Sequence, residues 1–135
     1  MRPGHIIGVT GADPCVGVIF TGPPNSNLPG VAYHIPPGGF YGGMLNYVEL
    51  INEHRMNGYR NVYIVGGTEN KDGNSNRYHA EFAAQRSAMN YTRIQTIQAG
   101  VDSSGHIYAS DPDRQWWLNK TIPNRDSSSG GSGHR

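Results

Sequence analysis

The sequence contains a single cysteine, Cys15, among its 135 residues. One cysteine cannot form a disulfide within the chain, so the fold must be stable without covalent cross-links. The Cys15 thiol is therefore free to react if its surroundings expose and activate it. On residue type alone, a lone cysteine among apolar residues is more often an inert buried side chain.

The chain also lacks a strong net charge and a long apolar run. Its 11 Lys and Arg residues nearly balance 10 Asp and Glu residues, which leaves a formal charge of +1 and no basic field for nucleic acid. No apolar run approaches the length of a membrane-spanning helix, and the run after His5 is too short for a signal-peptide core. We therefore expect no nucleic-acid partner, no membrane partner and no signal peptide.

Glycine and proline, by contrast, are plentiful, with 19 and 9 residues respectively. This composition is typical of a small domain with many tight turns, and the length suits one domain with a real core. We predict a domain over residues 1–125 that acts as a monomer. Residues 126–135 (DSSSGGSGHR) form a Gly/Ser-rich stretch that we predict to be a disordered tail.

Apolar runs predict three strands in the first part of the chain. The runs at 5–9 and 16–21 are nearly continuous, which is typical of strands buried on both faces. A loop rich in turn formers separates the second run from a third one at 30–35, so these two should pair as a hairpin.

The period then changes to that of an amphipathic helix over residues 41–57, with Met44, Tyr47, Val48 and Ile51 on one face. Gly58 should end this helix because glycine adopts the left-handed conformation at least steric cost. The segment 61–65 is predicted to be a strand.

The second half of the chain is predicted to hold a polar loop without core residues at 68–76 and a second helix at about 77–90, whose alanines and Phe82 would pack on a sheet. Three alternating segments, joined in part by a turn at 102–105, should form an antiparallel end of the chain: 93–98, 106–109 and 115–118. The expected fold is α/β (α+β layered), with a mixed, mostly antiparallel sheet packed against two helices.

One pair of residues stands out as a candidate site. Cys15 follows a glycine-bearing turn (Thr10-Gly-Ala-Asp-Pro) and precedes an apolar run, and His34 lies in the next apolar run, Gly30-Val-Ala-Tyr-His-Ile-Pro-Pro37. Adjacent strands would bring the two side chains together at a sheet edge. An imidazolium beside a thiol lowers its pKa, so Cys15 and His34 form a candidate nucleophile and base.

These two stretches resemble the CheD-like thiol deamidases, a family that includes the chemoreceptor glutamine deamidase CheD, the catalytic domains of cytotoxic necrotizing factors and Burkholderia lethal factor. The likeness is specific at Thr10…Cys15-Val-Gly-Val and at Gly30-Val-Ala-Tyr-His34-Ile-Pro-Pro, and it extends more loosely over residues 5–118. CheD has Gly-Ser before the cysteine, where this chain has Asp13-Pro14, and its turn is one residue longer. The resemblance implies a CheD-like fold and a hydrolase that converts glutamine side chains of a protein substrate to glutamate.

The same resemblance implies roles for the site residues and for the protein. Cys15 would attack the carboxamide, His34 would transfer the protons, and Thr10 would orient His34 through its hydroxyl. The amides of Gly11, Ala12 and the residues after them could stabilise the oxyanion. Because Asp13-Pro14 changes the substrate rim, and the segment 68–76 would add a recognition surface, we expect a bacterial effector or toxin that a specialised secretion route delivers to a target-cell cytoplasm. A chemoreceptor deamidase of the bacterial cytoplasm and a catalytically silent binding module are the alternatives.

A rival motif, His79-Ala-Glu81, has the H-x-E pattern of zinc-dependent base deaminases. The second half of that signature, P-C-x-x-C, is absent, and a catalytic zinc needs three protein ligands. We therefore place His79 and Glu81 in the first turn of the second helix, where a glutamate suits the positive end of the helix dipole. The glycine pairs at 38–39 and 66–67 lack the remaining residues of a phosphate-binding loop, so no metal or other cofactor is expected.

Overall fold

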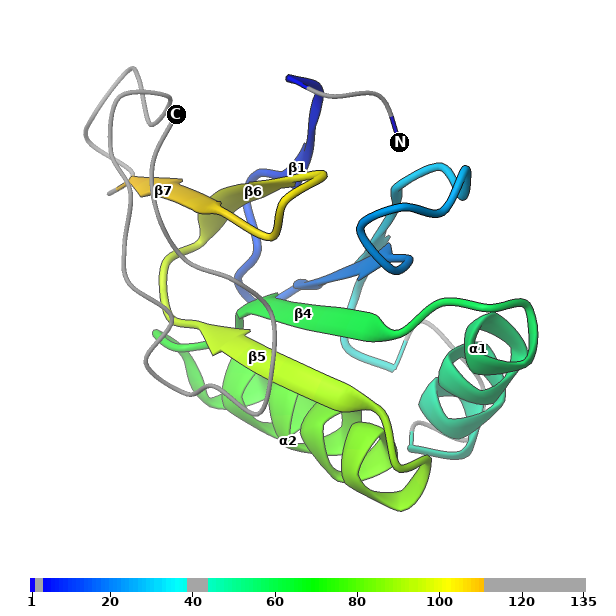
Figure 1. Cartoon of the computed structure of the whole chain (residues 1–135). Helices are drawn as coiled ribbons and strands as arrows, with labels where there is room; N and C mark the ends of the chain where they lie inside the picture. Colours follow the sequence, from blue (N-terminus) through cyan, green and yellow to red (C-terminus); the bar gives the residue numbers. More distant parts are fainter. Residues whose placement is uncertain (2–3, 39–43, 111–135) are drawn as a thin grey trace.

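The computed structural model describes residues 1, 4–38 and 44–110 (Figure 1). The elements follow one another as β1 (Ile6–Val9), β2 (Val16–Thr21), β3 (Val31–Ile35), α1 (Met44–Met56), β4 (Asn61–Gly66), α2 (Lys71–Arg86), β5 (Asn90–Ile94), β6 (Gln98–Asp102) and β7 (Ile107–Ser110). The strand predicted at 115–118, the domain end at 125 and the tail at 126–135 lie outside the described residues. Neither of the two described helices has the length and apolar character that a bilayer crossing requires.

The strands form two sheets that lie on top of each other. A four-stranded sheet has the order β3-β2-β4-β5, antiparallel except for β4 and β5, which run parallel and are connected by α2. A three-stranded antiparallel sheet has the order β1-β6-β7. Both helices cover one face of the larger sheet, and the smaller sheet covers the other (Figure 1). The predicted mostly antiparallel α+β fold with two helices is confirmed, although the strands divide into two sheets.

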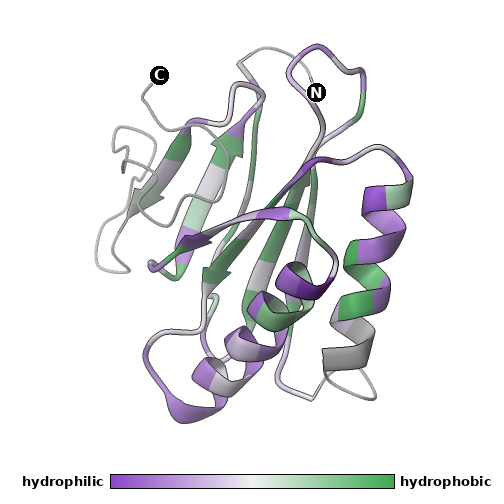
Figure 2. Cartoon of the chain, turned by 60° about the horizontal axis from the view of Figure 1, so that its bottom comes forward, coloured by the Kyte–Doolittle hydropathy of each residue, from purple (hydrophilic) through white to green (hydrophobic). Residues whose placement is uncertain are grey.

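Strand β2 lies at the centre of the molecule because apolar residues cover both of its faces. All six of its residues are buried. Val16, Val18 and Phe20 pack under the helices, whereas Ile19 packs against the smaller sheet, as the alternation of side chains along a strand requires. Figure 2 shows that these central strands are more apolar than α2, which packs on the same face of the sheet as α1. The prediction of a strand buried on both faces is confirmed for β2.

Strand β1 does not share this burial. It pairs only with β6, at the edge of the smaller sheet, and three of its four residues are partly or fully exposed. The prediction that this strand is buried on both faces is therefore wrong. A short β-branched run is equally suited to an edge strand that packs through one face.

The predicted hairpin and first helix are confirmed. Strands β2 and β3 pair antiparallel from Val16 opposite Ile35 to Phe20 opposite Val31. In α1, Tyr47 and Ile51 point into the core, and Gly58 has a φ of +98° just beyond the helix end. These local patterns predict the structure well because helical periodicity and a left-handed glycine are strong signals.

The prediction for the second helix is wrong in its position. Helix α2 begins at Lys71, so most of the predicted loop at 68–76 is helical, and it ends at Arg86 rather than near residue 90. Asn70 caps the helix, accepting a hydrogen bond from the Gly73 N–H at 2.9 Å. The first two turns contain glycine and asparagine, which have low helix propensity, and buried contacts override this preference. The predicted core residue Phe82 is 51% exposed.

The grouping of the last strands is also wrong. Residues 90–94 form β5, which joins the larger sheet beside β4. Strand β6 pairs with β7 on one side and with β1 on the other. Among the described residues, the third strand of the smaller sheet is β1, from the start of the chain, and the segment 115–118 lies outside the described range. The turn at 102–105 is confirmed, since the Gly105 N–H donates to the Asp102 carbonyl at 3.0 Å.

Gly66, at the end of β4, allows a test of how closely β4 packs against Ala12 of the turn that joins the two sheets. Its φ is +80°, and a Cβ atom there would lie 2.0 Å from the Ala12 carbonyl oxygen. We expect Gly66→Ala to lower the free energy of unfolding by about 3 kcal/mol, from about 1–2 kcal/mol for the left-handed backbone and the rest from overpacking. Urea unfolding followed by circular dichroism measures this loss.

Gly38→Ala is the matched control, because Gly38 has a φ of +63° but no atom within 4 Å of the position that a Cβ would take. It should cost only the backbone part, about 1–2 kcal/mol. Equal losses in the two variants would contradict a close contact between Gly66 and Ala12.

Candidate active site

Cys15 lies at the end of a turn that crosses between the two sheets. This Cys15 turn, residues 10–15, connects β1 of the smaller sheet to β2 of the larger one. Cys15 is half-buried and directly precedes the buried strand β2. A thiol at a strand end can be reached from solvent, whereas a thiol inside β2 could not, so its position is compatible with reactivity.

His34 lies on the neighbouring strand and points to the same turn. It is exposed and pairs with Gly17, and continuing the register by one pair sets Cys15 opposite Pro36. His34 and Cys15 are therefore diagonal neighbours, a relation that typically separates Cα atoms by about 7–8 Å. Within the described residues, the thiol and the imidazole share no hydrogen bond.

The imidazole is instead bound to the main chain of the Cys15 turn. Its Nε2 lies 3.2 Å from the carbonyl oxygen of Gly11. A carbonyl oxygen can only accept, so Nε2 carries the proton of this hydrogen bond. In the neutral ring, Nδ1 then has the free lone pair, which is what a base requires.

The other predicted site residues lie in the turn, with different roles from those expected. Thr10 is exposed, and the described partner of the His34 ring is the Gly11 carbonyl rather than the Thr10 hydroxyl. The Ala12 N–H donates to Ile97 at 2.9 Å, so Ala12 cannot supply an oxyanion donor. The Asp13 N–H is also used, by the Gly11 carbonyl at 2.9 Å. Gly11 and Cys15 itself are the turn amides that remain to be considered for this task.

Helix α2 holds the turn through its capping residue and its second turn. Asn70 Nδ2 donates to Asp13 Oδ2 at 2.9 Å, and Asn76 Nδ2 donates to the Pro14 carbonyl at 3.1 Å. The main chain adds a third contact, because the Gly67 N–H donates to the Ala12 carbonyl at 2.8 Å. Three consecutive residues before Cys15 are therefore fixed by the segment that includes the start of α2.

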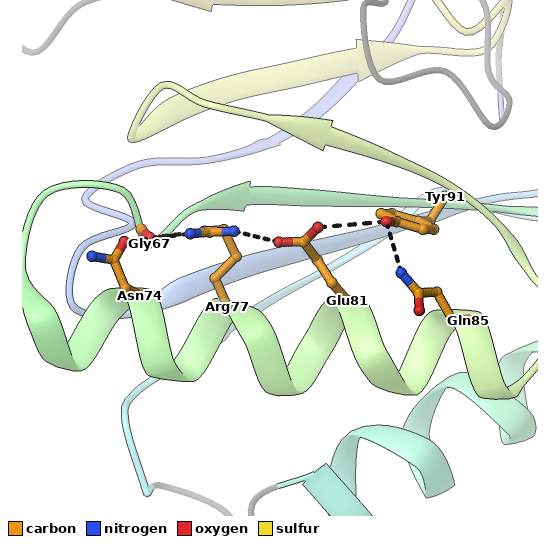
Figure 3. A network of polar contacts seen from close by, with 6 residues as sticks. All are labelled: Gly67, Asn74, Arg77, Glu81, Gln85 and Tyr91. Carbon is orange, nitrogen blue, oxygen red and sulfur yellow. Dashed lines mark hydrogen bonds and ion pairs between the residues drawn. The ribbon is translucent and has the colours of Figure 1, made fainter.

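Gly67 is itself held by a buried arginine. Arg77 is 4% exposed and donates from Nε to the Gly67 carbonyl at 2.9 Å, and its guanidinium forms an ion pair with Glu81 (Figure 3). The hydroxyl of Tyr91, on β5, extends this network by donating to Glu81 and accepting from Gln85 of α2 (Figure 3). A buried guanidinium needs such partners to offset the loss of its hydration. Through Arg77 the network holds Gly67, which in turn binds Ala12 of the Cys15 turn.

This arrangement corrects the expected place of His79 and Glu81. They lie in the middle of α2 rather than in its first turn, because the helix begins earlier than predicted. The Glu81 carboxylate forms an ion pair with Arg77. Across the described ranges, no group of three or more His, Cys, Asp or Glu side chains is arranged to hold a metal ion.

A cavity of about 110 Å³ lies where the end of β3 meets the two helices. Its lining includes Ile35, Pro36, Tyr47, Asn76 and His79. Burial raises the pKa of Tyr47, and the nearby Cys15 raises the pKa further. Cys15 is thus close enough to Tyr47, in the wall of this cavity, to influence its pKa.

Sequence reasoning misses the residues that support the site. Local patterns place Asn70, Asn76 and Arg77 in a loop or at a helix start, and Tyr47 only on a hydrophobic face. The sequence contains one usable signal, which is Asn70. Asparagine is a typical N-cap residue, so its position indicates that a helix could begin at Lys71. No local pattern predicts that Asn76 faces the core.

Comparison of the chain with protein-family models, with curated proteins and with solved structures finds no match in any of the three. The resemblance to CheD-like deamidases therefore rests on the residues of the two motifs alone.

The Asn70 side chain performs two tasks that substitution can separate. We expect Asn70→Ala to lower the free energy of unfolding by about 1–2 kcal/mol, because it removes both the helix cap and the hydrogen bond to Asp13. Asn70→Ser keeps a capping oxygen and should cost less than about 1 kcal/mol. Urea unfolding measures both values, and equal losses would show that the cap contributes little.

Proposed function

We propose that this protein is a protein-glutamine deamidase that uses Cys15 as a nucleophile and His34 as its acid and base. The observation that supports this best is the position of the only cysteine of the sequence. It is half-buried at the end of a turn to which the His34 ring, from the adjacent strand, is hydrogen-bonded. The sequence resemblance at these two stretches suggests the substrate.

The reaction follows from the chemistry of a carboxamide. The Cys15 thiolate attacks the carbonyl carbon, the C–N bond breaks, and His34 gives the nitrogen the proton with which it leaves as ammonia. Water, deprotonated by His34, then attacks the thioester and releases glutamate and the thiol. In the structure as it stands, Nε2 of His34 is bound to Gly11, and Nδ1 is the ring nitrogen outside this hydrogen bond.

For proton transfer, the ring must approach the sulfur more closely than it does while it is bound to Gly11. Catalytic hydrogen bonds are often long in a free enzyme and shorten when the substrate binds. The exposed position of His34 leaves room for this movement. The adjoining cavity, with both apolar and polar walls, offers space for part of a substrate chain beside the turn.

As the biological role, we propose a bacterial effector or toxin that acts on a target-cell protein. Two alternatives differ in substrate or in activity: a chemoreceptor deamidase, and a silent module that binds a partner through the same surface. Asp13 and Pro14, which distinguish this turn from that of CheD, favour the first proposal because they change the rim around Cys15. The recognition surface that we expected from residues 68–76 is reduced, because most of that segment is helix α2.

The catalytic proposal predicts that Cys15→Ser and His34→Ala each remove deamidation without unfolding the protein. Loss of the nucleophile or its base should reduce kcat/KM by at least about 1,000-fold, since the two act as a unit. Chemoreceptor cytoplasmic fragments and target-cell extracts serve as substrates, and mass spectrometry of peptides detects Gln-to-Glu conversion. Circular dichroism verifies the fold.

A chelator serves as the control for that experiment and should leave the activity unchanged. Substantial activity in Cys15→Ser would contradict the thiol mechanism, and zinc-dependent activity would favour the His79 and Glu81 alternative. A thiol that reacts with iodoacetamide only after unfolding would favour the silent binding module.

The proposed effector role predicts toxicity that depends on the thiol. Expression of the wild-type chain inside bacterial or eukaryotic cells should slow growth, whereas Cys15→Ala, expressed at the same level, should not. Growth curves and immunoblots measure both properties. Harmless expression in both cell types, together with deamidation of chemoreceptor fragments by the purified protein, would instead establish the chemotaxis alternative.

A further inference from the structure

Helix α2 contains a buried polar side chain that no sequence pattern indicates. Asn76 is 5% exposed, and both the nitrogen and the oxygen of its amide are hydrogen-bonded. Nδ2 donates to the Pro14 carbonyl at 3.1 Å and to the Ile35 carbonyl at 2.9 Å, while Oδ1 accepts from the Tyr47 hydroxyl at 2.6 Å. Because the two carbonyls can only accept, these contacts define which side of the amide carries the nitrogen.

The two carbonyls belong to the residues next to the proposed nucleophile and base. Pro14 directly precedes Cys15, and Ile35 directly follows His34. One side-chain amide on α2 thus connects the backbone of both catalytic candidates, which lie on different segments of the chain.

The main-chain hydrogen bonds between β2 and β3 do not connect these two segments at Pro14 and Pro36. The β2–β3 ladder ends at Val16 opposite Ile35, and the next residues include Pro14 on one side and Pro36 on the other. Proline has no N–H to donate, so neither can extend the ladder. The Asn76 amide donates to the Pro14 and Ile35 carbonyls at this end of the ladder, where neither proline can donate.

We propose that Asn76 is a positioning residue that sets the distance between Cys15 and His34. This inference rests on the proposed function, because it assigns Asn76 a role in that thiol–imidazole pair. Tyr47 supports the residue by holding Oδ1, so that the nitrogen stays directed at the two carbonyls. A displacement of about 1 Å between reacting groups can reduce a rate by about 100-fold, so a small relaxation of this contact would be visible in catalysis.

Iodoacetamide alkylation of native Cys15 tests the proposal, because it reports the thiolate without any protein substrate. The rate is measured against pH for the wild type, for Asn76→Ala and for Asn76→Asp, each with His34 present and with His34→Ala. In the wild type, removal of His34 should slow alkylation near neutral pH by at least about 10-fold, since the imidazolium stabilises the thiolate. In both Asn76 variants, removal of His34 should change the rate by less than about 2-fold, because the thiolate then lies too far from the imidazolium to be stabilised by it.

Met89→Ala is the matched control, since it removes a buried side chain beyond the other end of α2. It should lower stability while keeping the dependence of alkylation on His34. Asn76→Asp retains the size of the side chain and its bond to Tyr47 and removes both donors, so it tests the donors even if Asn76→Ala does not fold. In the deamidation assay, the Asn76 variants should show a lower kcat than the wild type, with little change in KM.

The outcomes separate the two proposals. If alkylation of the wild type is independent of His34, the thiol–imidazole pair does not exist, and the proposed function is overturned together with the role of Asn76. If the wild type depends on His34 and a folded Asn76 variant depends on it equally, only the role of Asn76 is overturned. Loss of this dependence in the Asn76 variants but not in Met89→Ala supports the proposal.

Discussion

The Cys15 turn depends on hydrogen bonds from the segment that runs from the end of β4 into α2. The Cys15 turn passes from the smaller sheet to the larger one, and Pro14 gives it no N–H at the critical position. Buried carbonyls without donors are costly, so another element must satisfy them. Asn76 does so for Pro14, and Gly67 does so for Ala12. The polar start of α2 is therefore a structural requirement of the turn.

The topology explains why α2 can reach this turn. Strands β4 and β5 run parallel, so the chain must cross over the sheet between them, and α2 forms that crossover. The helix begins soon after the end of β4, and Gly66 at that end lies opposite Val16 of β2. The first turns of α2 consequently start beside Cys15. The parallel pairing of β4 and β5 therefore requires a crossover, and the first turn of that crossover helix, α2, lies next to the candidate site.

Local patterns in the sequence predict the central hairpin, α1 and the two candidate residues, and fail where distant residues decide the structure. Val16 to Thr21 reads as a buried strand because its apolar residues serve both faces. Residues 70–76 read as a loop because asparagine and glycine are poor helix formers, yet Asn70 caps the helix and Asn76 satisfies buried carbonyls. The pairing of β1 with β6 joins opposite ends of the described chain, and no local pattern contains that information. Likewise, the contact between His34 and Gly11 appears only once the strands are paired.

Asp13 and Pro14, the two residues at which this turn differs from that of CheD, each have a hydrogen-bond partner on α2 or at its cap. A carboxylate and a proline in place of two small residues add a charge and remove a donor next to Cys15. Asn70 donates to the Asp13 carboxylate, and Asn76 donates to the Pro14 main-chain carbonyl. The backbone before Cys15 can then keep a defined position although its sequence differs. Pro14 is exposed, whereas Asp13 is partly buried and hydrogen-bonded through Oδ2 to Asn70, so the proline ring is the more accessible of the two side chains.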